Sequence, residues 1–207
     1  MRIVTVVVLV FSLFLPTVKA GEFNPVLDIK DPAPKWAALP ATDGKRYAFE
    51  DFKDHEVLVV VFTCNSCPYA VDYEDRLVTF AKEAKDSNVA LVAINVNKVE
   101  EDLLPAMKER AKQKGFNFPY LFDETQEIAK QYGAGYTPEF FVLNKERQVV
   151  YMGAMDDSTD SDQVKVRYVE LAVAAAKEGE LPAKQETVAI GCLIRIERTR
   201  RNRSGGK

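Results

Sequence analysis

A run of six apolar residues, Val57–Phe62, is followed after one residue by the first of two cysteines, Cys64 and Cys67. Most of the run is β-branched, which is typical of a strand that is buried on both faces of a parallel sheet. Pro68 suits the first turn of a helix, and apolar residues recur at helical spacing from there to Lys85. The two cysteines are therefore predicted to lie between a central strand and a helix, at the sheet edge where α/β proteins bind ligands.

The rest of the chain alternates strand-like and helix-like segments. Expected strands cover residues 45–49 and 89–94 and the arms of a hairpin at 139–143 and 148–152, and expected helices cover 102–114, 124–132 and 164–177. An apolar segment at 118–122 follows the first of these helices, and Asp156 and Asp157 are expected in a solvated turn. Strands that alternate with helices and end in a hairpin predict an α/β fold, a three-layer α/β/α sandwich around a central mixed sheet.

The first 20 residues have the layout of a secretory signal peptide: Arg2, an apolar stretch over 3–15, Pro16 and small residues before Gly21. Because the apolar stretch is shorter than the ~20 residues of a membrane-spanning helix, we expect cleavage before Gly21. An uncleaved segment would instead anchor the protein in a membrane. In either case the folded part is expected to be exported, to a periplasm or outside the cell.

The remaining chain has the length of one domain. We expect a Pro-rich, extended lead-in over 21–34, a single domain over 35–180, and a C-terminal extension over 181–207 that ends in a basic, disordered tail. The net charge is −3, but segment 1–20 carries +2 and segment 195–207 carries +5, so residues 21–194 carry −10. An acidic body of this kind argues against nucleic acid as a partner.

The spacing of the two cysteines suits thiol–disulfide exchange. Two residues three apart on one helical turn lie ~5–6 Å apart, within reach of a disulfide bond. Free N–H groups at a helix start lower the pKa of a thiol from ~8.5, so Cys64 can attack a disulfide and Cys67 can resolve the mixed intermediate. Three acidic residues early in the helix would oppose this by raising thiol pKa values: Asp72, Glu74 and Asp75.

A second stretch, GYTPEFF at 135–141, places Pro138 at the start of an apolar strand. Together with FTCNSCPY, FPYLFDETQEIAKQYGA and YMGAMDDS, it resembles the thioredoxin-like superfamily, and within it the redoxins, a peroxiredoxin-like branch, over residues 32–178. The resemblance implies a cis peptide bond before Pro138 that faces the cysteines, and a Thr137 backbone that binds an extended substrate peptide. It also implies an N-terminal β-hairpin over 35–62 and a redoxin-type insertion over 97–123.

Three features depart from the plain thioredoxin pattern. Thr63 replaces the tryptophan before the first cysteine, and Asn65-Ser66 replaces the Gly-Pro pair between the cysteines. Leu58 stands where thioredoxins have the buried acid that transfers protons. Another acid would have to do so, and Glu124 and Glu127, at the end of the insertion region, are candidates.

The third cysteine, Cys192, follows Gly191. The peroxiredoxin-like subgroup that this chain resembles tends to end in the same Gly-Cys dipeptide. One interpretation is a small apolar residue in a strand over 188–196. The other is an accessory thiol that forms a mixed disulfide with Cys64 or Cys67, or that links two chains. The sequence leaves both interpretations open.

A thiol-dependent peroxidase is the first competing function. Peroxiredoxins carry a proline seven residues before the attacking cysteine and a threonine three residues before it. For Cys64 those positions hold Val57 and Val61, and for Cys67 they hold Val60 and Cys64. Without the threonine hydroxyl and the proline, peroxide would be poorly oriented.

Metal binding, including copper delivery, is the second competing function. A Cys₃His site would need the three cysteines and His55, the only histidine, which lies at the far end of the strand that leads to Cys64. Copper chaperones with this fold carry a CxxxC pair and a histidine in a late loop. This chain has a CxxC pair, and its histidine is early in the sequence.

We therefore expect an exported thiol–disulfide oxidoreductase in which Cys64 attacks, Cys67 resolves, and Thr137 and Pro138 hold the substrate. Its partners would be protein disulfides or dithiols, or small thiols, with an external donor of electrons. The reaction needs no organic cofactor and no metal ion. Reductase and oxidase directions both stay open, because ~30 mV changes the equilibrium tenfold.

Overall fold

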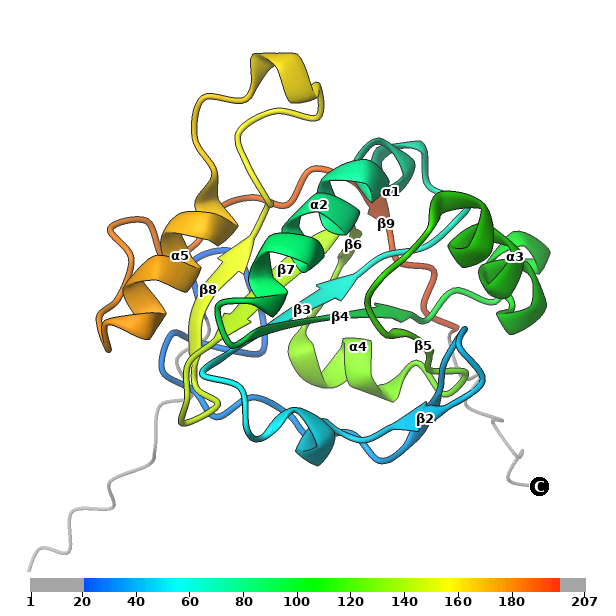
Figure 1. Ribbon diagram of the computed structural model, residues 1–207, viewed down its shortest axis with the longest axis horizontal. Helices are drawn as coiled ribbons and strands as arrows, with labels where there is room; N and C mark the ends of the chain where they lie inside the picture. The colour runs from blue at the N-terminus through cyan, green and yellow to red at the C-terminus, as the bar shows by residue number, and fades with distance from the viewer. Residues whose placement is uncertain (1–20, 198–207) are drawn as a thin grey trace, which may run out of the picture.

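The computed structural model describes residues 21–197, and its central sheet has strands in the order β5–β4–β3–β7–β8 (Figure 1). The strands are β3 (Val57–Phe62), β4 (Val89–Asn95), β5 (Tyr120–Phe122), β7 (Glu139–Leu143) and β8 (Val149–Gly153). Strand β4 runs parallel to β3 and β5, whereas β7 runs antiparallel to β3 and β8. This mixed sheet, with β3 at its centre, confirms the predicted fold class.

Helices cover both faces of the sheet. They are α1 (Pro68–Asp72), α2 (Glu74–Lys85), α3 (Leu104–Lys114), α4 (Glu127–Tyr132) and α5 (Tyr168–Lys177). Figure 1 shows α2 and α4 on opposite faces of the sheet. Val57, Val59 and Val61 of β3 pack with residues of α2, α3 and α5, and the alternate residues of β3 pack with residues of α4 and the N-terminal segment. Because successive side chains of a strand point to opposite faces, β3 joins two cores and the three-layer sandwich forms as predicted.

The N-terminal β-hairpin is present but short. Strand β1 (Leu39–Pro40) pairs antiparallel with β2 (Arg46–Tyr47), and the 3₁₀ helix η1 (Phe49–Phe52) ends the expected strand over 45–49 early. A bridge between Ala41 and Leu121 joins this hairpin to β5, the edge strand that occupies the apolar segment 118–122. The insertion over 97–123 therefore consists of the 3₁₀ helix η2 (Glu100–Asp102), α3 and β5.

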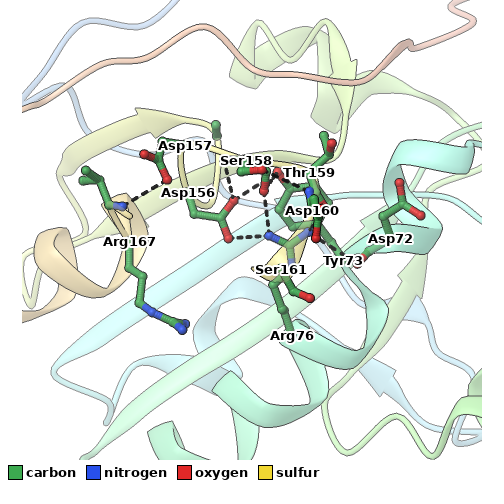
Figure 2. Close-up of polar contacts among 12 residues, drawn as sticks. Asp72, Tyr73, Arg76, Asp156, Asp157, Ser158, Thr159, Asp160, Ser161 and Arg167 are labelled. Atoms are coloured by element: carbon green, nitrogen blue, oxygen red, sulfur yellow. Dashed lines mark hydrogen bonds and ion pairs between the residues drawn. The ribbon is translucent and has the colours of Figure 1, made fainter. Parts of the chain in front are cut away.

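The helix expected over 68–85 is interrupted at Tyr73, which ends α1 and begins α2. Its hydroxyl donates to Asp156 at 3.2 Å, and Arg76 donates to Asp156 at 2.5 Å and to the carbonyls of Ser158 and Thr159 (Figure 2). The Arg76 guanidinium also lies 3.7 Å from the Tyr73 ring centre. These contacts tie the start of α2 to the loop after β8. Asp156 is thus buried, and its expected place in a solvated turn is wrong.

Several boundaries differ from those expected. The helices expected from residues 102, 124 and 164 begin at 104, 127 and 168. Asp123 explains why α4 begins three residues later than expected. Its carboxylate accepts hydrogen bonds from the Thr125 and Ile128 N–H groups and stabilises a turn before the helix. The strand expected over 188–196 contracts to β9 (Cys192–Leu193), which pairs with β6 (Tyr136–Thr137).

Both ends of the described chain lie against the sheet. The N–H of Lys30 donates to the Val149 carbonyl, the N–H of Val149 donates to the Asp31 carbonyl, and the N–H of Thr187 donates to the Met152 carbonyl. The predicted signal segment and residues 198–207 of the basic tail lie outside the described residues. Within residues 21–197, no helix has the length and apolar character needed to cross a membrane.

Candidate dithiol site

Cys64 and Cys67 lie where the sequence predicts, in the turn between β3 and α1. Cys67 is the N-cap residue of α1, and Pro68 occupies the first turn. Both thiols are free, and the residues are only 3% and 2% exposed. Together with Ala70 they form a small buried cluster, and Cys192 packs against it. The fold therefore gathers all three cysteines of the chain.

Thr137 contacts both sulfurs of the pair. The peptide bond between Thr137 and Pro138 is cis, as the family resemblance implied. The Thr137 hydroxyl lies 3.4 Å from the Cys64 sulfur, and the Thr137 carbonyl accepts a hydrogen bond from the Cys67 thiol at 3.1 Å. One residue beside the proline therefore positions both thiols.

A fully buried carboxylate, Asp102, holds the turn between the cysteines. It accepts hydrogen bonds from the N–H groups of Asn65 at 2.7 Å and Ser66 at 3.0 Å, and from the Ser66 hydroxyl at 2.5 Å. The Ser66 oxygen is 3.8 Å from the Cys64 sulfur, so a polar chain connects Cys64 to Asp102. Asp102 was missed at the sequence level because it ends the acidic run 100–102, and only the folded insertion turns it inward.

The two thiols interact directly, so their ionisation belongs to the pair. Hydrogen bonding to Cys64 lowers the pKa of Cys67, and burial opposes this only in part. The pKa of Cys64 is raised by its hydrogen bond to Cys67, by burial and by the negative charge of Asp102. An ionised Cys67 cannot donate to the Thr137 carbonyl, which limits the fall of its pKa. In the reduced pair, the pKa of Cys64 is thus raised and not lowered as we predicted, and the pKa of Cys67 is lowered instead.

The acidic residues at the start of α2 act differently from what we expected. Glu74 is buried and accepts two hydrogen bonds from the Arg110 guanidinium, each at 2.7 Å. The carboxylate whose charge raises the pKa of Cys64 is Asp102, from the insertion. Glu127, a candidate for proton transfer, instead forms an exposed ion pair with Lys130.

Cys192 reaches the site through β9. In the antiparallel pair of β6 and β9, Cys192 lies opposite Thr137 and Leu193 lies opposite Tyr136, and Figure 1 shows β9 beside the start of α1. This strand therefore already pairs with the Thr137 backbone, which the resemblance assigned to a substrate peptide. Hydrogen bonding to Cys67, followed by burial, raises the pKa of Cys192 to about 11. Cys192 is thus both a strand residue and a neighbour of the Cys64–Cys67 pair.

Three exposed apolar side chains adjoin the site residues in sequence. Tyr69 follows Cys67 by two positions and is 43% exposed, Tyr136 precedes Thr137 and is 37% exposed, and Leu193 is 68% exposed. Since Tyr136 and Leu193 are cross-strand neighbours, they form one patch.

The residues of the hypothetical Cys₃His site do not meet. His55 precedes β3 and lies near the Phe52 carbonyl, whereas Cys64 follows β3 at its other end. Among residues 21–197, no three His, Cys, Asp or Glu side chains are grouped so that they could hold a metal ion.

A buried CxxC pair at a helix start, opposite a cis-proline on the adjoining strand of a mixed sheet, defines the thioredoxin-like class of proteins. The chain belongs to the Redoxin family, whose family model matches residues 27–169.

Individual relatives agree with this class. Thiol-disulfide oxidoreductase ResA from Bacillus thuringiensis is 28% identical over 110 residues, which are 52% of this chain and 60% of that protein. The chain thus spans less than two thirds of the curated relatives it matches. An uncharacterized conserved protein from Geobacillus kaustophilus is 36% identical with a TM-score of 0.78, covering 85% of this chain and 96% of that one. A thioredoxin family thiol:disulfide interchange protein from Chlorobium tepidum shares the fold at 22% identity and a TM-score of 0.54, covering 65% and 92%.

Proposed function

We propose that this protein is a thiol–disulfide oxidoreductase whose redox pair is Cys64 and Cys67. The observation that carries the proposal is the contact of both sulfurs with Thr137, at 3.4 Å and 3.1 Å, beside the cis-proline. The name of the ResA relatives, thiol-disulfide oxidoreductase, supports the same class of reaction.

In the reductase direction, Cys64 attacks one sulfur of a partner disulfide. A bond forms between that sulfur and Cys64 while the partner's S–S bond breaks, and the second partner sulfur leaves as a thiolate. The proton of Cys64 passes to the Cys67 thiolate beside it and then to the departing thiolate. Cys67 next attacks Cys64, which forms the Cys64–Cys67 disulfide and releases the first partner sulfur. Two electrons move to the partner, and the oxidase direction is the reverse.

The roles of the two cysteines follow from their surroundings. Cys67 interacts with Cys192 of β9, whereas Cys64 faces the hydroxyls of Thr137 and Ser66. We therefore assign the attack to Cys64 and the resolution to Cys67. The Thr137 hydroxyl is placed to donate to the Cys64 sulfur when negative charge develops on it.

Protein disulfides or dithiols, or small thiols, are the proposed partners, with an external electron donor. Tyr69, Tyr136 and Leu193 offer apolar contact area to a protein partner. An extended partner peptide could pair with the Thr137 backbone beside Pro138 only after β9 leaves that edge. Export is proposed from the signal-like segment 1–20 alone.

Trapping of mixed disulfides tests this function. Reduced protein is mixed with insulin as a model disulfide substrate, quenched with acid and analysed on non-reducing gels. Cys67→Ser should accumulate a mixed disulfide on Cys64, because resolution is blocked, whereas Cys64→Ser should accumulate much less. Equal trapping by both variants would refute the assigned roles, and no trapping together with no insulin reduction would refute the function.

A thiol-dependent peroxidase is a second candidate, because the Thr137 hydroxyl supplies a donor near Cys64 that Val57 and Val61 do not. It predicts that hydrogen peroxide converts Cys64 to sulfenic acid faster than a disulfide substrate oxidises the pair.

A further inference from the structure

The placement of β9 brings a third thiol to the redox pair. Cys192 lies directly opposite Thr137 in the antiparallel pair, so its side chain is on the same side as that of Thr137, whose hydroxyl contacts the Cys64 sulfur. Cys192 packs against the cluster of Cys64, Cys67 and Ala70. It is neither fully buried nor disulfide-bonded in this state.

Gly191 makes this close approach feasible. A Cβ atom on Gly191 would lie 2.1 Å from the Thr137 carbonyl oxygen and 3.1 Å from the Pro138 nitrogen. Both neighbours are backbone atoms, so they cannot move aside as a flexible side chain could. Any larger residue at this position would push β9 and Cys192 away from the site. Gly135 offers a contrast in the same region, because a Cβ there would meet nothing within 4 Å.

The state of the Cys64–Cys67 pair affects the pKa of Cys192. In the reduced protein, hydrogen bonding to Cys67, burial and the charge of Cys67 raise the pKa of Cys192, while Arg195 opposes this. When Cys64 and Cys67 join in a disulfide, Cys67 loses its negative charge. The hydrogen bond to Cys67 and the charge of Cys67, two of the three causes that raise the pKa of Cys192, are then removed, while burial remains and the positive charge of Arg195 favours the thiolate. Cys192 therefore becomes a better nucleophile when a disulfide lies beside it.

We propose that Cys192 is a third redox thiol, which moves the disulfide from Cys64–Cys67 to Cys67–Cys192. This inference rests on the proposed exchange function. The Cys192 thiolate attacks the Cys67 sulfur, a Cys67–Cys192 bond forms, the Cys64–Cys67 bond breaks, and Cys64 leaves as a thiolate that takes up the proton from Cys192. No external oxidant or reductant is consumed. The protein then stores two oxidising equivalents while Cys64 is free again.

The first test uses the full chain and its single-cysteine variants. Reduced proteins at about 10 µM are oxidised with diamide, alkylated with N-ethylmaleimide and mapped by mass spectrometry after digestion without reduction. In Cys64→Ser, an internal Cys67–Cys192 disulfide should exceed the linked dimer by about 100-fold, since short-range effective concentrations reach the millimolar range. Cys67→Ser, which retains Cys64 and Cys192, should give at least about tenfold less internal disulfide.

Wild-type protein separates this inference from the function on which it rests. Part of the oxidised wild-type protein should carry alkylated Cys64 and a Cys67–Cys192 bond, and Cys192→Ser should abolish alkylation of Cys64. If oxidised wild-type contains only the Cys64–Cys67 disulfide and Cys64→Ser keeps two free thiols, the role of Cys192 is refuted while the exchange function stands. If oxidised wild-type forms neither a Cys64–Cys67 nor a Cys67–Cys192 disulfide, and Cys192→Ser forms no Cys64–Cys67 disulfide, the exchange function fails and this inference fails with it.

Gly191 and Gly135 provide a matched pair of variants that change no cysteine. In the Cys64→Ser background, Gly191→Ala should reduce the yield of Cys67–Cys192 disulfide at least about tenfold, because it displaces β9. Gly135→Ala should leave that yield unchanged. Circular dichroism confirms that each variant is folded. An unchanged yield in folded Gly191→Ala would contradict the assigned role of β9.

Discussion

Replacing Asp102 by asparagine should make the dithiol pair less reducing. The Ser66 oxygen is 3.8 Å from the Cys64 sulfur and 2.5 Å from the Asp102 oxygen, so the carboxylate lies within about 6 Å of the sulfur. Two unit charges at that distance repel by about 3 kcal/mol at an effective dielectric constant near 20. Asp102→Asn keeps the shape and an oxygen acceptor for the turn but removes the charge.

The loss of this repulsion lowers the pKa of Cys64 and stabilises the reduced pair relative to the disulfide. The reduction potential should therefore rise, by at most about 60 mV, because about 30 mV corresponds to 1.4 kcal/mol. The full value is a limit because the ionisation belongs to the coupled pair and not to Cys64 alone. Equilibration with glutathione buffers, followed by alkylation and mass analysis of the pair, measures the potential.

A matched control changes a carboxylate that solvent screens. Asp75, whose side chain is 88% exposed, can be replaced by asparagine and should change the potential by less than about 10 mV. A potential that stays constant or falls in folded Asp102→Asn would refute the reasoning that Asp102 destabilises charge on Cys64.

Three further predictions concern other contacts. Thr137→Val removes the hydroxyl that lowers the pKa of Cys64, so insulin reduction should slow by about fivefold, the value of one hydrogen bond of about 1 kcal/mol. Asp156→Asn removes the buried carboxylate that pairs with the largely buried Arg76 guanidinium, and the free energy of unfolding in urea should fall by about 3–5 kcal/mol. Burial raises the pKa of Glu139, so the folded state binds more protons and stability falls as the pH rises through the window between the ordinary and the raised value. Glu139→Gln should remove that pH dependence. At pH values above the window, it should raise the melting temperature by about 2–4 °C.

An unchanged rate in Thr137→Val would show that the hydroxyl does not assist Cys64. Glu170→Gln breaks the exposed pair with Arg167 and should change stability by less than about 0.5 kcal/mol. An equally small loss in Asp156→Asn would contradict the importance of the buried pair. If Glu139→Gln is destabilised at every pH, the hydrogen bonds that the Glu139 carboxylate accepts from two backbone N–H groups outweigh the cost of burying its charge.

The sequence predicted those features that depend on local patterns. The buried run in β3, the alternation of strands and helices and the CxxC pair at a helix start all arise from neighbouring residues. The cis bond before Pro138 was predicted by resemblance to a family, since spacing alone does not distinguish cis from trans.

Long-range contacts account for what the sequence did not predict. The interruption at Tyr73 depends on Asp156, more than 80 residues later, and nothing in the helical periodicity of 68–85 indicates it. Asp102 joins the site only because the insertion folds over the turn that contains Asn65 and Ser66. The position of Cys192 depends on the pairing of two strands of two residues each, which are too short to leave a periodic pattern.

The proposed function requires Cys64 and Cys67 to exchange two electrons as a dithiol–disulfide pair. The most direct measurement is a redox titration of the purified protein in glutathione buffers, with thiols trapped in acid and each cysteine assigned by mass, and with Cys192→Ser in parallel. We predict a two-electron transition in both proteins, confined to Cys64 and Cys67 in Cys192→Ser. This function would be contradicted if both thiols stayed reduced throughout and only added peroxide modified them, with a single cysteine converted to sulfenic acid.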